Sequence, residues 1–234
     1  MPDSESGEPR YPRWINPPNL ARLAWAWGTV SLDVDADGWS DVALNSNNCS
    51  APMDIIWDER RGAGPGALLL NRDGEGFVDV TWEAGVANVD DRGRYQDGRG
   101  LATGDLNNDG YPDLVYANRT YNPTQSDPLA QEPGTPKVWL SQARDGQWLQ
   151  LDLVGTTSNR DGLGASVHLH GFEGSRVHML GAGGGTNSSS ERLVTLGLGD
   201  VERVNISVNF PSGATVTLLE VEPNQRIVVE EPVE

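Results

Sequence analysis

The stretch that decides the fold is Asp33-Val-Asp-Ala-Asp-Gly-Trp-Ser-Asp41, which leads into the apolar run Val42–Leu44. A second copy, Asp105-Leu-Asn-Asn-Asp-Gly-Tyr-Pro-Asp113, leads into Leu114–Tyr116. The copies begin at residues 33 and 105, which is a spacing of 72 residues. Internal repetition at a fixed spacing is typical of stacked structural units. We therefore predict two related β units in the N-terminal half of the chain.

The alternation of acidic residues in these loops predicts two calcium sites. A Ca²⁺ ion takes six or more oxygen ligands at about 2.3–2.6 Å, and the glycine of each loop permits the sharp turn that brings them together. The next backbone carbonyl and the last aspartate would add further oxygens. The predicted ligands are Asp33, Asp35, Asp37, Trp39 (backbone carbonyl) and Asp41 in the first loop, and Asp105, Asn107, Asp109, Tyr111 (backbone carbonyl) and Asp113 in the second.

These loops are not EF-hands. An EF-hand places a bidentate glutamate at the twelfth loop position, where this chain has Leu44 and Tyr116. The competing interpretation is a solvated turn rich in Asp, Asn and Gly, which needs no metal. Two copies in phase favour the metal. A cation wrapped by carboxylates leaves no open position for a substrate, so we expect structural rather than catalytic Ca²⁺.

The remainder of the chain has short apolar runs broken by Gly, Asn, Asp or Pro, a pattern that indicates an all-β protein. Residues 1–20 are rich in proline and charge and predict a disordered lead-in. A polar segment over 118–136 places a domain boundary near 140–147. The predicted strands are Asp41–Asn45, Ala67–Asn71, Phe77–Val80, Asp113–Ala117, Val138–Ser141, Leu149–Val154, Ser166–His170, Arg176–Leu180, Arg192–Leu196, Asn205–Asn209, Thr215–Leu219 and Arg226–Glu230.

Charge and hydropathy exclude several classes of partner. The 234 residues include 34 acidic and 17 basic ones, for a net charge of −17. This disfavours nucleic acid and anionic membranes, which bind basic surfaces. No apolar run approaches the roughly 20 residues that span a bilayer, and the polar N-terminus has no apolar segment of a signal peptide. We expect no nucleic-acid partner and no membrane insertion.

Two known families resemble parts of this chain. Residues 24–118, with both acidic loops and the intervening Leu68–Val86, resemble FG-GAP/VCBS-type β-propeller repeats. Residues 147–232 resemble the ASPIC/UnbV domain of the cartilage-acidic-protein family. The stretches that carry this second resemblance are Trp148-Leu, Leu153-Val-Gly, Ser158–Val167, Leu196-Gly-Leu-Gly199, Phe210-Pro-Ser-Gly213 and Pro223-Asn-Gln-Arg226.

The resemblance implies a partial β-propeller of about two blades over residues 21–140 and a β-sandwich-like domain over 147–232. It also implies calcium binding, an extracellular or cell-surface location, and interaction with a protein or glycan ligand, without naming a reaction. Closed propellers have at least four blades. We therefore expect a chain of two blades to be a piece of a longer propeller and to self-associate near the largely apolar stretch Leu20–Trp27.

The three histidines of the chain lie in a predicted hairpin made by Ser166–His170 and Arg176–Leu180. If residues 170 and 176 are paired, alternation sends Val167, Leu169, Val177 and Met179 to the core. The opposite face then carries His168, His170, Arg176 and His178. One hypothesis is a transition-metal site made by the histidines, and the other is an ordinary polar face.

An enzyme or carbohydrate-active domain at a loop face of the propeller is the alternative function, although the residues favour a binding role. Crowded carboxylates could act in pairs on a glycoside, and tryptophans could stack on sugars, but solvated loops and core packing account for both sets. A histidine and carboxylate set converging in a deep pocket would favour the enzyme. The residues concerned are Asp58, Glu59, Asp90, Asp91, Asp97, Trp25, Trp27 and Trp39.

Overall fold

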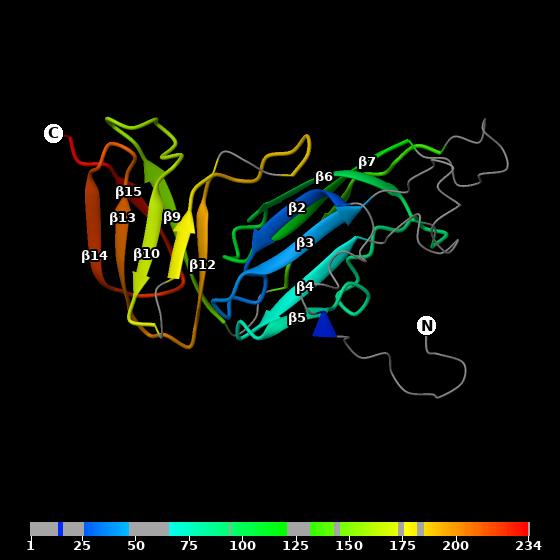
Figure 1. The fold of residues 1–234 in the computed structure, drawn as a ribbon, viewed down its shortest axis with the longest axis horizontal. Helices are drawn as coiled ribbons and strands as arrows, with labels where there is room; N and C mark the ends of the chain where they lie inside the picture. The colour runs from blue at the N-terminus through cyan, green and yellow to red at the C-terminus, as the bar shows by residue number, and fades with distance from the viewer. Residues whose placement is uncertain are drawn as a thin grey trace.

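The computed structural model describes residues 26–46, 66–93, 95–120, 132–142, 146–172, 176–181 and 185–233, together with the backbone of 14–15. These residues contain strands and turns but no helix, so none of them forms a helix that could span a membrane. The strands form four open sheets, which confirms the all-β prediction (Figure 1). They are β1 (Trp14–Ile15), β2 (Ala26–Leu32), β3 (Asp41–Ser46), β4 (Ala67–Arg72), β5 (Gly76–Asp79), β6 (Asp97–Gly104), β7 (Asp113–Arg119), β8 (Lys137–Trp139), β9 (Gln147–Val154), β10 (Ser166–His170), β11 (Arg176–Met179), β12 (Val194–Gly199), β13 (Val204–Asn209), β14 (Thr215–Val221) and β15 (Gln225–Glu230).

The N-terminal half consists of two antiparallel sheets, ordered β1-β5-β4-β3-β2 and β6-β7-β8. Each contains one copy of the sequence repeat: Leu32 pairs with Asp41 at the first acidic loop, and Gly104 pairs with Asp113 at the second. Strands β2 and β6 lie next to each other, as the inner strands of neighbouring blades do (Figure 1). This arrangement fits a partial β-propeller.

Sequence reasoning missed β2 and β6, and β6 contains three glycines, a residue that is depleted in strands. The structure shows why glycine is needed in β2. A Cβ atom on Gly28 would lie 2.5 Å from the Cβ of Leu101 in β6. The glycine therefore lets the two inner strands approach closely, which a larger residue would prevent.

Buried amides also join the two sheets. The Asn45 Nδ2 group of β3 donates to the Gly100 carbonyl of β6 at 2.8 Å. Asn88 Nδ2 donates to Asn45 Oδ1 and to Asn118 Oδ1, each at 2.8 Å. Asn45 and Asn88 are both fully buried. Their hydrogen bonds satisfy polar groups that burial would otherwise leave unpaired, and so they fix how the sheets pack.

The edge of β6 is covered by the C-terminal half of the chain. Ser188 Oγ donates to the Leu101 carbonyl at 2.8 Å, and Ser190 Oγ accepts from the Thr103 amide at 3.2 Å. The Glu191 amide donates to the Thr103 carbonyl at 2.9 Å. An uncovered edge strand offers unpaired backbone groups to other chains. Residues 188–191 occupy these groups on β6.

Backbone pairing extends into the N-terminal segment that was predicted to be disordered. Trp14 pairs with Val78 and Ile15 with Phe77, so β1 adds a fifth strand beside β5. Of the stretch Leu20–Trp27 only Ala26 and Trp27 are described, so Trp25 lies outside the described residues. The same is true of Asp58 and Glu59.

The C-terminal half consists of two packed sheets, ordered β11-β10-β13-β14 and β12-β9-β15 (Figure 1). The inner faces of both sheets supply one core, as in a β-sandwich, which confirms the predicted fold of this part. Its fully buried side chains include Leu149, Leu151, Val167, Leu169, Leu196, Ile206 and Val208. The strand predicted at Arg192–Leu196 instead runs over Val194–Gly199, because the two glycines continue the pairing with β9.

The predicted register of the histidine hairpin is wrong by one residue. Val167 pairs with His178, and His168 pairs with Val177. A slip of one residue moves every side chain of a strand to the other face. Val177 and Met179 are therefore 48% and 73% exposed instead of lying in the core. β11 is an edge strand, and its inner face packs against the N-terminal half. Polar side chains can therefore lie on that face.

A buried carboxylate ties the C-terminal segment to the loop after β9. Glu231 Oε2 accepts from the amides of Thr156, Thr157 and Ser158 at 2.7–2.8 Å. Its Oε1 atom accepts from the hydroxyls of Ser158 and Ser212. Burial alone would raise the pKa of Glu231, but the hydrogen bonds from Ser212, Ser158 and Thr156 outweigh it and lower the pKa from 4.5 to about 2.

We predict that Glu231→Gln destabilises the protein at neutral pH and that the difference from wild type disappears in acid. The pKa is lower in the folded protein, so the carboxylate contributes stability above pH 4.5 and loses it as the pH falls towards 2. Urea unfolding of both proteins across this pH range measures the effect. Glu230→Gln, an exposed neighbour on β15, is the matched control. A difference between wild type and Glu231→Gln that does not change with pH would contradict the prediction.

Candidate metal centre at the domain junction

The first acidic loop brings three carboxylates together between β2 and β3. Ligand oxygens of Asp33, Asp35 and Asp37 lie within 4.8 Å of one another. The Oδ1 atoms of Asp33 and Asp35 are buried and have no hydrogen-bond partner in the described part of the chain. Buried acceptors without a donor are costly, and anionic ones more so. A bound cation would satisfy both atoms.

The loop backbone is folded by hydrogen bonds to the same carboxylates. The Gly38 amide donates to Asp33 Oδ2 at 2.8 Å, and the Trp39 amide donates to Asp37 Oδ1 at 2.7 Å. Ala36 and Gly38 have positive φ angles of 56° and 88°. These bonds use one oxygen each of Asp33 and Asp37 and leave the other oxygens available to a metal.

The second acidic loop repeats this conformation. Its Asn108 and Gly110 have φ angles of 58° and 93°, and the Gly110 amide donates to Asp105 Oδ2 at 2.9 Å. Asn107 stands where the first loop has Asp35, and its Nδ2 group donates to Asp109 at 2.8 Å. Within the described residues, only the first loop gathers three acidic side chains. The second loop therefore offers a cation less negative charge.

The last aspartate of each loop has an architectural role that sequence reasoning missed. Asp41 is fully buried, and its two oxygens accept from the Val34 amide at 2.9 Å and from the Asn71 amide of β4 at 2.8 Å. Asp113 is bonded in the same way to the amides of Leu106 and Ser141. Each carboxylate thus joins its loop to the adjacent part of the sheet.

Burial and nearby negative charges raise the pKa values of Asp33, Asp37 and Asp41. Burial, followed by the nearby charge of Asp37, raises the pKa of Asp33 to about 7. Burial also raises the pKa of Asp41 to about 8, although its backbone hydrogen bonds act in the opposite direction. A nearby cation favours the ionised forms and reverses this trend. The donor set is entirely oxygen, which suits Ca²⁺ or Mg²⁺ better than zinc.

The C-terminal half lies directly against the first loop. Gly197 of β12 is so close that a Cβ atom there would lie 1.9 Å from Asp33 Oδ2 and 2.7 Å from the Ala36 backbone. The Gly199 amide donates to the Ala36 carbonyl at 2.9 Å. The first loop thus packs against the Gly-Leu-Gly stretch of β12, residues 197–199.

Contacts at the second loop come from β9 and from the segment before β12. Gln150 Nε2 donates to Asp105 Oδ2 at 2.8 Å, and the Asp105 amide donates to Glu191 Oε2 at 2.9 Å. The Tyr111 hydroxyl donates to the Gly146 carbonyl at 2.6 Å. Both acidic loops therefore lie at the junction of the two domains, a position that their sequence does not reveal.

Arg176 faces this junction and not the outer surface predicted for it. Its guanidinium lies 5.4 Å from the ring centre of Trp39 and 4.2 Å from that of Phe172. A Cβ atom on Gly38 would lie 1.8 Å from Arg176 Nη1, so the glycine makes room for it. Trp39 thus packs against an arginine of the C-terminal domain.

The three histidines do not form one metal site. His178 shares the inner face of its sheet with Val167, whereas His168 and His170 lie on the outer face. The Nε2 atoms of these two contact Ser166 Oγ at 3.1 Å and Ser207 Oγ at 2.9 Å. The hypothesis of a site made by all three is therefore wrong, because it depended on the incorrect register.

Two of the carboxylates proposed as catalytic pairs, Asp90 and Asp97, are engaged in other contacts, and Asp91 is exposed. Asp97 is buried and forms ion pairs with Arg99 and Arg119. Asp90 accepts from the Arg92 amide at 2.9 Å within a turn. These contacts explain both residues without a substrate.

We predict that Gly197→Ala disturbs the junction. The new Cβ atom would collide with Asp33 and with the Ala36 backbone, so the domains must shift apart or the loop must move. We expect a lower unfolding midpoint and a change in the fluorescence of Trp39, which packs against Arg176 at this junction.

Gly100→Ala is the matched control for this prediction. A Cβ atom on Gly100, which is also a strand glycine, would lie 3.2 Å from the Ala117 Cβ, so a small adjustment accommodates it. Equal effects of the two substitutions on stability and fluorescence would contradict the close contact at Gly197.

Comparisons with known proteins agree with the two-part organisation. Residues 155–234 match the family described as ASPIC and UnbV, and residues 98–128 match the FG-GAP repeat family. Cartilage acidic protein 1 of Xenopus tropicalis is 42% identical over 103 residues, which are 43% of this chain and 15% of that protein. Cartilage acidic protein 1 of Homo sapiens is 44% identical over 81 residues, which are 35% of this chain and 11% of that protein.

The chain therefore spans only a small part of the length of these two relatives. The FG-GAP match contains the second acidic loop, and the first loop has the same backbone conformation and hydrogen bonds. The ASPIC and UnbV match contains the Gly-Leu-Gly stretch that contacts the first loop. The chain is thus similar to an FG-GAP repeat over residues 98–128 and to the ASPIC and UnbV family over residues 155–234, and its sequence resemblance predicted both matches.

Proposed function

We propose that this chain is a calcium-stabilised interaction module that acts outside the cell or at its surface. The observation that carries the calcium assignment is the first acidic loop, where two buried carboxylate oxygens lack any partner among the described residues. The location and the interaction role rest on the resemblance to the cartilage-acidic-protein family. The expected partner is a protein or a glycan. Nucleic acid is not expected, because a net charge of −17 repels it.

The two acidic loops should bind Ca²⁺ with different affinities. Calcium affinity rises with the number of charged ligands in the site. The first loop has Asp33, Asp35 and Asp37, whereas the second has Asn107 at the middle position. We expect the first loop to hold the tighter ion. The carbonyls of Trp39 and Tyr111 remain the proposed backbone ligands.

Calcium should raise the unfolding midpoint of the protein. Extracellular calcium modules have dissociation constants of about 0.1–1 mM. At about 1 mM calcium, mass action then adds about 0.4–1.4 kcal/mol of stability for each occupied site. Calorimetry with calcium and with excess chelator measures this difference. The same unfolding curve in both conditions would contradict the proposal.

Single substitutions should identify the two sites. Asp35→Ala should remove the tighter equivalent of bound calcium and Asp109→Ala the weaker one, as counted by isothermal titration. Asp91→Asn, which changes an exposed acidic residue outside both loops, is the control and should retain both equivalents. Loss of calcium in the Asp91 variant would point to general charge attraction instead of two built sites.

A further inference from the structure

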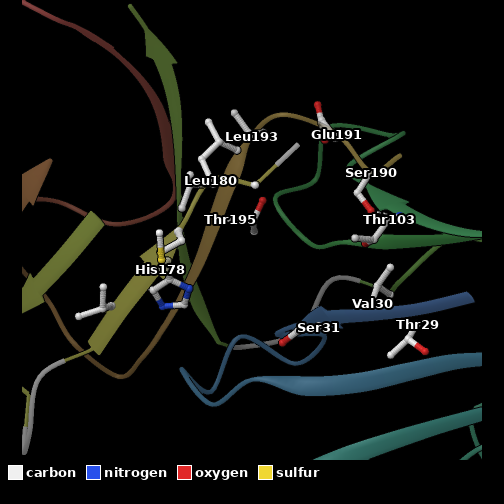
Figure 2. Close-up of a pocket in the computed structure, with 14 residues that line it drawn as sticks. Thr29, Val30, Ser31, Thr103, His178, Leu180, Ser190, Glu191, Leu193 and Thr195 are labelled. Atoms are coloured by element: carbon white, nitrogen blue, oxygen red, sulfur yellow. Dashed lines mark hydrogen bonds between the residues drawn. The ribbon is translucent and has the colours of Figure 1, made fainter. Parts of the chain in front are cut away.

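A pocket of about 450 Å³ lies between the two domains, beside the acidic loops (Figure 2). Its walls come from β2 and β6 of the N-terminal half and from β11, β12 and the segment before β12 of the C-terminal half. Small-molecule sites occur preferentially at such interfaces, and this volume falls within their usual range of about 300–1,000 Å³.

Five polar side chains in this pocket have no side-chain hydrogen bond within the described residues, and one of them is Thr103 of β6, whose Oγ1 atom is buried. Thr29 and Ser31 are exposed and alternate along β2, so both point to the same side of the strand. Thr195 of β12 and His178 of β11 lie across from them (Figure 2). The group comprises four hydroxyls and one imidazole, so it offers donors and acceptors together.

The charges around the pocket restrict what it can bind. Glu191 and His178 are the titratable residues among its lining, which contains neither lysine nor arginine. Burial, together with the nearby Arg176, lowers the pKa of His178, so its imidazole is neutral at physiological pH. An anion would meet the Glu191 carboxylate, and no cationic side chain lines the pocket to offset the repulsion. A neutral ligand avoids this repulsion.

Apolar side chains complete the lining. Val30, Leu180 and Val194 are buried in the walls, and Leu193 is half-buried among them. A ligand that suits this pocket has several hydroxyls for the polar groups and a C–H face for the apolar ones. We propose that the junction pocket binds a neutral polyhydroxylated ligand of monosaccharide size, such as the terminal sugar of a glycan. This inference rests on the interaction role proposed above but not on calcium binding.

Saturation-transfer NMR and calorimetry on the full chain test the proposal with defined sugars. The neutral probes are N-acetylglucosamine, methyl mannoside and methyl galactoside, and the anionic probe is glucuronic acid. We expect saturable binding of at least one neutral probe and weaker binding of glucuronic acid. Saturable binding of none of the neutral probes, or tighter binding of glucuronic acid, would overturn the proposal.

Substitutions then locate the site. Ser31→Ala combined with Thr195→Val should weaken binding of the neutral probe at least tenfold, and so should His178→Gln. Thr217→Val and His170→Gln are matched controls on the outer face of the β10–β14 sheet and should leave binding unchanged. Unchanged affinity in the pocket variants would also overturn the proposal. Calcium titration of the same samples separates failure of the sugar site from failure of the calcium sites.

Discussion

The rest of the structure depends on the burial of several carboxylates in one short loop. Asp33, Asp35 and Asp37 approach one another between β2 and β3, and two of their oxygens are buried without a donor among the described residues. Like charges at this distance destabilise each other, and burial increases the cost. Either protonation of the carboxylates or a bound cation must offset this cost. The raised pKa of Asp33 favours protonation when no cation is bound, and the alternative that we favour is a bound calcium ion.

This constraint extends from the loop to the junction of the two domains. Gly197 lies against Asp33, and the Gly199 amide is bonded to the loop tip at Ala36. An interaction that fixes the conformation of the loop therefore also fixes the surface against which β12 packs. The hydroxyl-lined pocket is formed by the same strands, β2 and β12. Cation binding, domain packing and ligand binding would thus share one set of contacts.

The repeat, the acidic loops and most strands could be predicted because they depend on local patterns. Alternating carboxylates and glycines determine the loop conformation, and the structure gives both copies positive φ angles at equivalent positions, Ala36 and Asn108. The prediction failed where long-range packing determines the position of a strand or the face on which a side chain lies. β2 and β6 need glycine for close approach, and Arg176 and His178 face inward because a second domain covers their strand. No local pattern shows that the Gly-Leu-Gly stretch contacts Asp33.

Terbium luminescence sensitised by tryptophan tests the central claim most directly, because Tb³⁺ occupies calcium sites and emits when an excited indole is close. Trp39 lies two residues from Asp37, and its own amide is bonded to that carboxylate. We expect strong sensitised emission that calcium displaces in a saturable manner and that Asp35→Ala strongly reduces, because this variant loses the ion beside Trp39. Emission that is absent, or that persists unchanged in Asp35→Ala, would contradict a cation held by the first acidic loop.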